Sequence, residues 1–158
     1  MDNPVPSFTE SYGQVIVGIG IDIEEIIRFQ KLIKAEKKLF FGKIFSAAEI
    51  DYANSKSDPA IHFCAIFTAK EATKKSFSIY VNLNLNSIEV LHDSSTGAPY
   101  IQIRETANTP QMRLLKKSNI FLSISHTHSV AVAVVVVTVP ENELRNTILE
   151  RKNEKLFL

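Results

Sequence analysis

The residues of VIVGIGIDI, positions 15–23, alternate with a period of two. This period is typical of a β-strand, in which successive side chains point to opposite faces. We expect the valine and isoleucine side chains at the odd-numbered positions to face the core. The other face carries Ile16, two glycines and Asp22, so it is nearly bare of side chains around one carboxylate.

Helical patterns follow this strand. EEIIRFQKLIKAE, residues 24–36, predicts a first helix, and Ser46 with Glu49 three residues later has the spacing of a capping box that opens a second. Asp58-Pro59 marks a break. Residues 60–77, AIHFCAIFTAKEATKKSF, contain no glycine or proline and many helix formers, so they predict a long helix.

Strand patterns dominate the second half of the chain. SIEVLHD and YIQIR flank a turn at residues 96–99, which predicts a hairpin. Thr109-Pro110 predicts the start of a short helix, with threonine as its cap. NIFLSIS and VAVAVVVV predict two further strands joined through residues 126–129. Together these elements indicate the α+β class.

The chain has no internal repeat or linker that would divide it. We expect a single domain over residues 1–140, in which residues 1–12, polar with two prolines, form a loose N-terminal arm. Residues 141–158 are rich in charge and weakly amphipathic, which predicts a C-terminal helical extension.

Composition narrows the function classes. The 158 residues include 18 basic and 17 acidic side chains, and the net charge of +1 gives no general electrostatic case for nucleic acid or an anionic membrane. The longest apolar run, Val130 to Val137, is far shorter than the roughly 20 residues of a membrane helix. The N-terminus lacks a signal-peptide pattern, and Cys64 is the single cysteine. These features predict a soluble protein of the cytoplasm with a buried thiol.

Three separated segments carry unusual chemistry: Asp22, Glu71 with Lys75, and Ser123-x-Ser125-His126. Taken alone, each segment also has a simple structural explanation that requires no function. Asp22 is well placed to cap the following helix, and Glu71 and Lys75 match an ordinary i,i+4 pair worth about 0.3–0.5 kcal/mol. The histidine segment has no third ligand nearby for zinc and also reads as a polar turn.

In combination, these segments resemble the 4'-phosphopantetheinyl transferases of the holo-acyl-carrier-protein synthase type, over approximately Val15 to Val137. The stretches that carry the resemblance are GIGIDIEEIIRF (18–29), IFSAAEIDYA (44–53), FTAKEATKK (67–75), a Gly-x-Pro hairpin and SISHTHSVAVAVV (123–135). The resemblance implies a small antiparallel β-sheet packed against a long helix. It also implies a homotrimer with active sites shared between subunits.

The resemblance implies an activity as well. Such enzymes transfer the 4'-phosphopantetheine arm of coenzyme A to a serine of an apo acyl carrier protein and release 3',5'-ADP, in support of fatty acid or polyketide biosynthesis. Asp22 and Glu71 would be the protein ligands of Mg²⁺, which prefers carboxylate, phosphate and water oxygens. Lys75 would face a pyrophosphate oxygen. The general base is Glu71 or a metal-bound water, and the sequence leaves both open.

Further contacts follow from the same resemblance. Coenzyme A would contact Pro99, Ser125, His126 and Thr127 in addition to Lys75. Arg28 would meet the acidic carrier protein, with a solvated helix charge as the alternative.

The chain departs from the bacterial members of this type at several positions. Ile66 and Ala98 stand where those members have arginine and lysine, and residues 74–90 lack the usual glycines. The transferase domains of fungal fatty acid synthases are similar to this chain in their Gly-Ala-Pro turn. We expect Lys70, Lys74 and Arg104 to be available as replacement cations.

Three hypotheses follow. The leading one is an active Mg²⁺-dependent transferase. The second is a non-catalytic homologue of the same fold that binds coenzyme A or a carrier protein. The third is a structural or assembly protein in which the charged tail is the interaction element.

Overall fold

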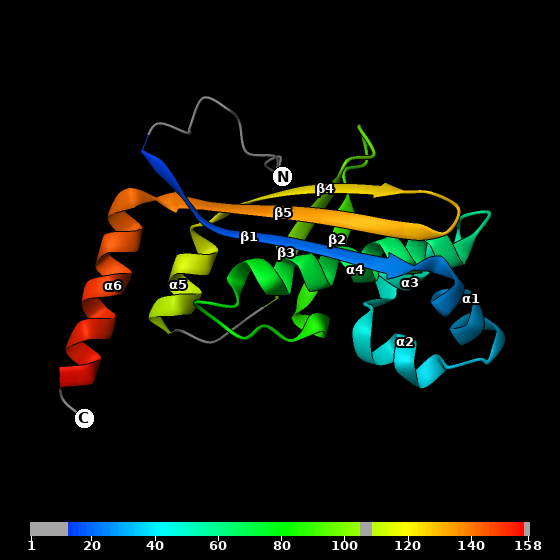
Figure 1. Ribbon diagram of the computed structural model, residues 1–158, viewed down its shortest axis with the longest axis horizontal. Helices are drawn as coiled ribbons and strands as arrows, with labels where there is room; N and C mark the ends of the chain where they lie inside the picture. Colours follow the sequence, from blue (N-terminus) through cyan, green and yellow to red (C-terminus); the bar gives the residue numbers. More distant parts are fainter. Residues whose placement is uncertain (1–12, 105–108, 157–158) are drawn as a thin grey trace.

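The computed structural model describes residues 13–104 and 109–156 (Figure 1). The predicted N-terminal arm, residues 1–12, lies outside this part. The elements in chain order are β1 (Gln14–Glu25), α1 (Ile26–Lys34), α2 (Lys38–Ile44), α3 (Ala47–Asn54), α4 (Pro59–Phe77), the 3-10 turn η2 (Leu85–Ser87), β2 (Ile88–His92), β3 (Pro99–Ile103), α5 (Pro110–Lys116), β4 (Asn119–His126), β5 (Val130–Pro140) and α6 (Glu141–Leu156).

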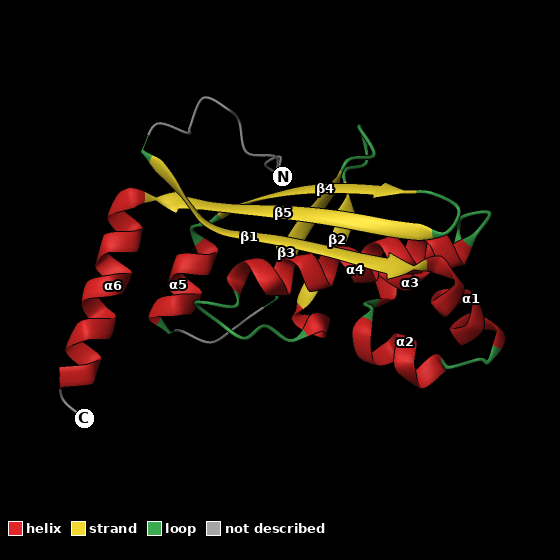
Figure 2. Ribbon diagram, viewed as in Figure 1, coloured by secondary structure: helices red, strands yellow, loops and turns green. Residues whose placement is uncertain are grey.

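Two antiparallel sheets make up the β-structure. β1, β5 and β4 form a three-stranded sheet in that order, and β2 pairs with β3 in a separate hairpin. The long helix α4 lies along one face of the larger sheet, with α1, α2 and α3 at one end (Figure 2). The predicted α+β architecture, a small antiparallel sheet packed against a long helix, is confirmed.

Local signals explain several helix starts. The Ser46 hydroxyl accepts a hydrogen bond from the backbone N–H of Glu49, and the Glu49 carboxylate accepts one from the backbone N–H of Ser46, so the predicted capping box is present. Thr109 caps α5 by accepting from the N–H of Met112 at 3.2 Å. Asp58 caps α4, which begins at Pro59, one residue before the predicted start at residue 60.

The first predicted helix begins later than expected, because β1 continues to Glu25. Helix α2 was not predicted, since its seven residues are few and include a glycine. Its formation follows from tertiary packing: the Phe41 ring lies 4.6 Å from the Phe63 ring of α4, and Phe45 lies 5.1 Å from the same ring.

The predicted orientation of β1 is wrong beyond the irregularity between Ile16 and Gly18. Val17 packs against the core as expected, but Ile19, Ile21 and Ile23, which were also expected to face the core, are 61–65% exposed. The glycine face is the one that packs on α4: a Cβ on Gly18 would lie 1.9 Å from the carbonyl oxygen of Ser76. The missing side chains therefore admit the helix backbone, and the bulky face of the strand points away from the core.

A buried ion pair between Lys70 and Glu49 links α4 to several neighbouring elements. The Nζ of Lys70 lies 2.7 Å from the Glu49 carboxylate, and both side chains are 0% exposed. Lys70 also donates to the carbonyl oxygens of Ile44 and Leu85, and Glu49 accepts from the N–H of Val90. Burial lowers the pKa of Lys70, while the Glu49 charge opposes this shift. The pair ties α2, α3, η2 and β2 to α4.

Helix α6 follows β5 directly and packs beside α5. Its side chain Thr147 is buried, and Glu143 forms an ion pair of 2.6 Å with Lys117. Among the described residues, no helix has the length and apolar character needed to cross a membrane.

Candidate active site

The position of Asp22 is set by a regular contact between β1 and α4. The strand and helix run past each other so that two residues along β1 correspond to about one turn of α4. The Sγ of Cys64 lies 3.6 Å from the carbonyl oxygen of Glu24 at one end of this contact, and Gly20 lies against the helix backbone further along. Asp22 falls between these two points, on the side of α4 that carries Glu71 and Lys75.

Asp22 and Lys75 form a close ion pair. The Lys75 Nζ lies 2.7 Å from Asp22 Oδ1 and 3.2 Å from the carbonyl oxygen of Ile21. The hydrogen bond to Asp22 raises the pKa of Lys75, and the charges of Glu71 and Glu24 act in the same direction. Lys75 is therefore a stable cation at neutral pH, and its side chain is 52% exposed and open to a ligand.

The second carboxylate oxygen of Asp22 does not share the ion pair with Lys75. Within the described residues, Oδ2 is buried and has no hydrogen-bond partner. A buried anionic oxygen without a donor is costly, and a hard cation is a suitable partner for it. The structure describes no group of three or more His, Cys, Asp or Glu side chains that would hold a metal ion by themselves. Two carboxylates completed by ligand oxygens fit Mg²⁺ better than an all-protein cage.

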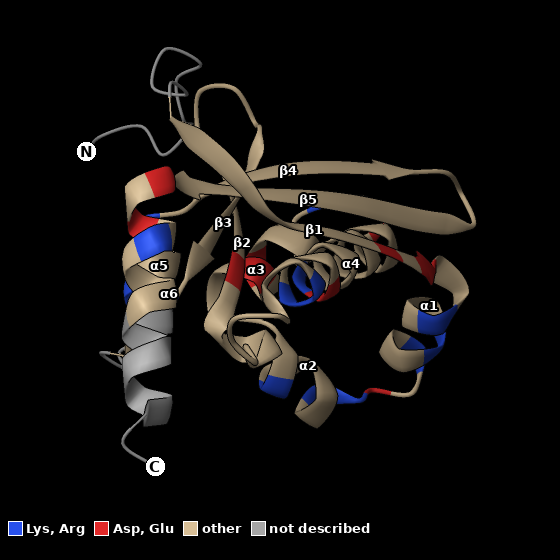
Figure 3. Ribbon diagram, turned by 60° about the vertical axis from the view of Figure 1, so that its left-hand side comes forward, with Lys and Arg blue, Asp and Glu red and all other residues tan. Residues whose placement is uncertain are grey.

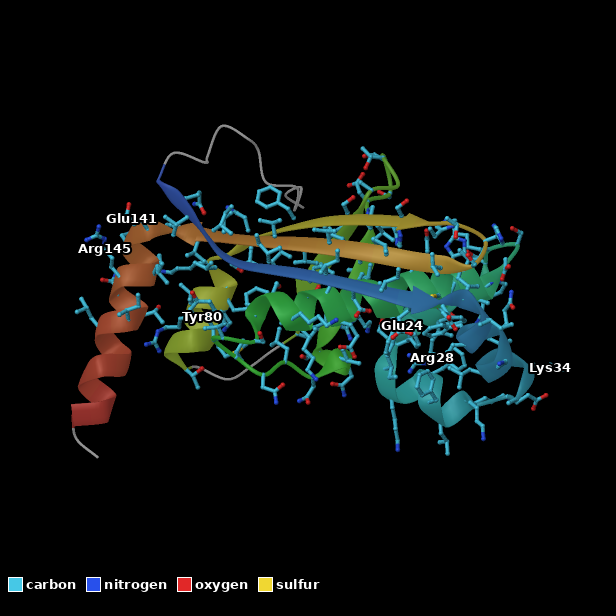
Figure 4. All side chains as sticks on the ribbon, in the orientation of Figure 1. Glu24, Arg28, Lys34, Tyr80, Glu141 and Arg145 are labelled. Carbon is cyan, nitrogen blue, oxygen red and sulfur yellow. The ribbon has the colours of Figure 1, made fainter. Side chains whose placement is uncertain are left out.

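Arg28 lies at the start of α1, next to the end of β1. Its guanidinium lies 2.7 Å from the Glu24 carboxylate and 5.0 Å from the centre of the Phe67 ring, so it is held between an anion and an aromatic face (Figure 4). The side chain remains 46% exposed. Figure 3 shows further basic positions along α1, where Lys31 and Lys34 follow on the same helix.

The residues expected to contact coenzyme A do not lie beside Asp22. Ser125 and His126 end β4, and Thr127 closes the following turn, where its hydroxyl accepts from the N–H groups of Ser129 and Val130. Pro99 begins β3 in the separate hairpin.

The larger sheet separates these residues from Asp22. β5 lies between β1 and β4, so Asp22 and His126 lie on opposite edge strands, about 10 Å apart across the sheet. Successive positions of β4 point to opposite faces, so Ser125 and His126 also diverge. Within a single subunit, therefore, the Asp22, Glu71 and Lys75 group is separate from the group formed by Ser125, His126 and Thr127.

Comparison with known proteins assigns the family. Residues 18–135 match the 4'-phosphopantetheinyl transferase superfamily. The chain belongs to this superfamily. The holo-acyl-carrier-protein synthase of Syntrophus aciditrophicus (strain SB) is 34% identical over 118 residues, which cover 72% of this chain and 88% of that protein. The same enzyme of Thermodesulfovibrio yellowstonii (strain ATCC 51303 / DSM 11347 / YP87) is 36% identical over 112 residues, covering 71% and 89%.

A solved member of the superfamily has the same fold. The crystal structure of a holo-(acyl-carrier-protein) synthase from Bacillus anthracis str. Ames in complex with CoA (3',5'-ADP) is 30% identical, with a TM-score of 0.61. The match covers 78% of this chain and 97% of that chain. Helix α6 lies beyond the residues that match the superfamily.

Two of the three expected replacement cations are already engaged. Lys70 is wholly buried and directs its ammonium to Glu49 and two carbonyl oxygens, so its expected role toward a ligand is wrong. Arg104 forms an ion pair of 2.7 Å with Glu89. Lys74 is half-buried on α4.

Sequence reasoning missed a second basic group near β4. Lys56, His62 and His92 gather around Tyr52, although they are spread over 37 positions of the chain. No spacing signal identifies such a group, because its members come from α4, from β2 and from the loop before α4. Only the fold brings them together.

Proposed function

We propose that the protein is a Mg²⁺-dependent holo-acyl-carrier-protein synthase. It transfers the 4'-phosphopantetheine arm of coenzyme A to a serine of an apo acyl carrier protein. The observation that carries this proposal is the pairing of Asp22 with Lys75 beside Glu71, in a chain of this superfamily. Relatives named holo-acyl-carrier-protein synthase, one of them solved with CoA, support the choice of substrates.

The reaction is a phosphoryl transfer. The serine oxygen attacks the phosphorus that carries the pantetheine arm, the bond from this phosphorus to the bridging oxygen breaks, and 3',5'-ADP leaves. Asp22 and Glu71 would hold Mg²⁺, which when bound neutralises charge on the pyrophosphate. The buried Oδ2 of Asp22 is free to take part. Lys75 would donate to a pyrophosphate oxygen, and the serine proton would pass to Glu71 or to a water.

A homotrimer is the proposed assembly. The outer face of the three-stranded sheet is apolar along paired positions of β1 and β5, where Ile19 lies opposite Val136, and Ile21 opposite Val134. Exposed isoleucines on a continuous apolar face are typical of a surface that another subunit covers. Association would also bring the β4 residues of one copy toward the Asp22 site of another. This arrangement explains why one chain separates the two groups.

The carrier protein would dock on α1. Arg28, in the first turn of α1, pairs with Glu24 near the end of β1, the strand that carries Asp22, and Lys31 and Lys34 extend the basic surface. An acidic carrier helix matches this charge. We place the reaction in the cytoplasm, in fatty acid biosynthesis. We assign it to residues 1–140, with residues 141–158 as a helical extension.

Intact mass spectrometry tests this function. Apo carrier proteins are incubated with the protein, coenzyme A and Mg²⁺, and the proposal predicts a mass increase of one phosphopantetheine together with release of 3',5'-ADP. Coenzyme A binding without any modification of the carriers would instead indicate a non-catalytic homologue.

A further inference from the structure

A pair of charged side chains, Glu24 and Arg28, joins β1 to α1. The Nη1 of Arg28, in the first turn of α1, donates to the Oε2 of Glu24 at 2.7 Å. Figure 4 labels both side chains at this junction. They are four positions apart but do not share a helix, because Glu24 belongs to β1 and α1 begins at Ile26. The pair is therefore a contact between two elements.

The backbone that carries Glu24 is held by neighbouring elements. Its carbonyl oxygen accepts from the Cys64 thiol of α4 at 3.6 Å. Two residues later, the N–H of Ile26 donates to the carbonyl oxygen of Ser129 at 2.9 Å. The Glu24 side chain is itself only 20% exposed. Its carboxylate is therefore presented to the first turn of α1 from a fixed position.

A buried aromatic surface holds the other side of Arg28. The guanidinium carbon lies 5.0 Å from the centre of the Phe67 ring and 5.7 Å from that of Phe29. The two ring centres are 5.5 Å apart, and both side chains are buried. Guanidinium groups stack favourably on aromatic faces. Glu24 and the two rings therefore select one orientation of a long side chain that otherwise samples many.

Arg28 keeps hydrogen-bond donors for a ligand in this orientation. A guanidinium has five N–H groups, and within the described residues Glu24 accepts from one nitrogen, Nη1. The Arg28 side chain is 46% exposed. Its remaining donors suit the two oxygens of a second carboxylate, which a guanidinium binds in a bidentate manner.

We propose that Glu24 is a positioning residue that orients Arg28 to receive an acidic side chain of the carrier protein. This inference rests on the proposed function, in which the carrier docks at Arg28. Glu24 acts through Arg28 and takes no part in the chemistry at Asp22.

The charge of Glu24 also opposes an acidic partner, and the two effects differ in size. Ordering one long side chain at an interface lowers affinity roughly 2- to 12-fold, a loss that a preordered Arg28 avoids. Repulsion between two carboxylates about 7 Å apart in water changes affinity by less than about threefold, and physiological salt screens it further. Positioning is therefore the larger effect, and loss of the Glu24 side chain weakens carrier binding.

Steady-state kinetics with the full chain test this role. The apo carrier protein that the mass-spectrometric assay identifies is varied at saturating coenzyme A and Mg²⁺, and unfolding curves show that each variant is folded. We expect Glu24→Ala to raise the KM for the carrier about three- to tenfold, with kcat within about twofold of wild type. Glu24→Gln keeps an oxygen that accepts from Arg28, so its KM should stay within about twofold of wild type.

A double-variant cycle separates positioning from a direct contact. Arg28→Ala should raise the KM at least about tenfold, and Glu24→Ala added to it should cause no further increase. Asp51→Ala is the matched control, because it removes an exposed carboxylate of α3. It should keep the wild-type KM and kcat.

Four results would overturn the inference. A lower KM in both Glu24 variants would mean that Glu24 repels the carrier instead of orienting Arg28. An unchanged KM in Glu24→Ala would show that Arg28 needs no positioning, and an accompanying fall in kcat would place Glu24 at the Asp22 site. An unchanged KM in Arg28→Ala would exclude docking at Arg28 while the transferase activity stands. A wild-type protein that modifies no carrier in the panel would contradict the proposed function and this inference together.

Discussion

Gly20 of β1 and Ala72 of α4 are in backbone contact: a Cβ built on Gly20 would lie 1.9 Å from the Ala72 carbonyl oxygen. This contact places the strand against the helix one step before Asp22, so it sets the distance between Asp22 and the helix that carries Glu71 and Lys75. The glycine is required by the close approach, since its backbone does not adopt a positive φ.

Gly20→Ala should therefore separate β1 from α4. We expect a loss of about 1–3 kcal/mol in the free energy of unfolding, the typical cost of overpacking, and a loss of carrier modification beyond what the unfolded fraction explains. Chemical denaturation and the mass-spectrometric assay measure the two effects. Gly42→Ala is the matched control, because nothing lies within 4 Å of its Cβ. It should stabilise α2 by roughly 0.5–1 kcal/mol, and equal behaviour of the two variants would refute this account.

The buried pair of Lys70 and Glu49 predicts strong non-additivity. Lys70→Met leaves the Glu49 carboxylate buried without its cation, which should lower the free energy of unfolding by about 3–5 kcal/mol. The double variant Lys70→Met with Glu49→Leu removes both charges and should recover much of this loss. Denaturant titrations of the two single variants and the double variant form the cycle. Additive losses would mean that the two side chains do not interact.

The outer face of the sheet predicts the oligomeric state. Light scattering should give three times the chain mass of 17.7 kDa for the wild-type protein. Ile21→Glu introduces a charge on this face and should reduce the mass to that of one chain. Leu39→Glu, on α2, changes a side chain that is 83% exposed and should leave the mass unchanged. A trimer that tolerates Ile21→Glu would exclude this face as the interface.

The two lowered histidine pKa values predict acid sensitivity. His62 and His92 bind protons less readily in the folded chain than at the ordinary value of 6.5, so the unfolded chain takes up protons first as the pH falls through 6.5. The free energy of unfolding should decrease from pH 7.5 to 5.5. His92→Gln should flatten this decrease, and denaturant titrations across the range measure it. An identical slope in the variant would count against the burial of this imidazole.

Local signals along the chain predicted much of the fold. The capping box of Ser46, the break at Asp58-Pro59 before the long helix and the turn at Gly97 are short-range features, and the structure has each of them. The expectation that the isoleucines of β1 face the core was wrong, because the alternation of residues identifies a strand but does not show which of its faces is covered. The answer depends on Gly18 and Gly20, which admit a helix backbone from more than 50 positions away.

For the candidate site, too, the sequence identified residues but not the contacts between distant segments. The sequence indicated Asp22 and the Glu71–Lys75 pair as two separate segments, and the fold joins Asp22 to Lys75 through one ion pair. It gave no sign that Lys70, next to Glu71, is buried against Glu49, or that His62 and His92 meet at Tyr52. These contacts depend on how α3, α4 and β2 pack together.

We propose that Asp22 and Glu71 hold the Mg²⁺ on which transfer depends. The most direct test measures carrier modification against Mg²⁺ concentration for the wild-type protein and for Glu71→Gln, with unfolding curves to show that the variant is folded. We predict wild-type turnover that EDTA abolishes and Mg²⁺ restores, and a Glu71→Gln rate at least about 10²-fold lower at every Mg²⁺ concentration. Wild-type turnover in EDTA, or a fully active Glu71→Gln protein, would contradict the claim.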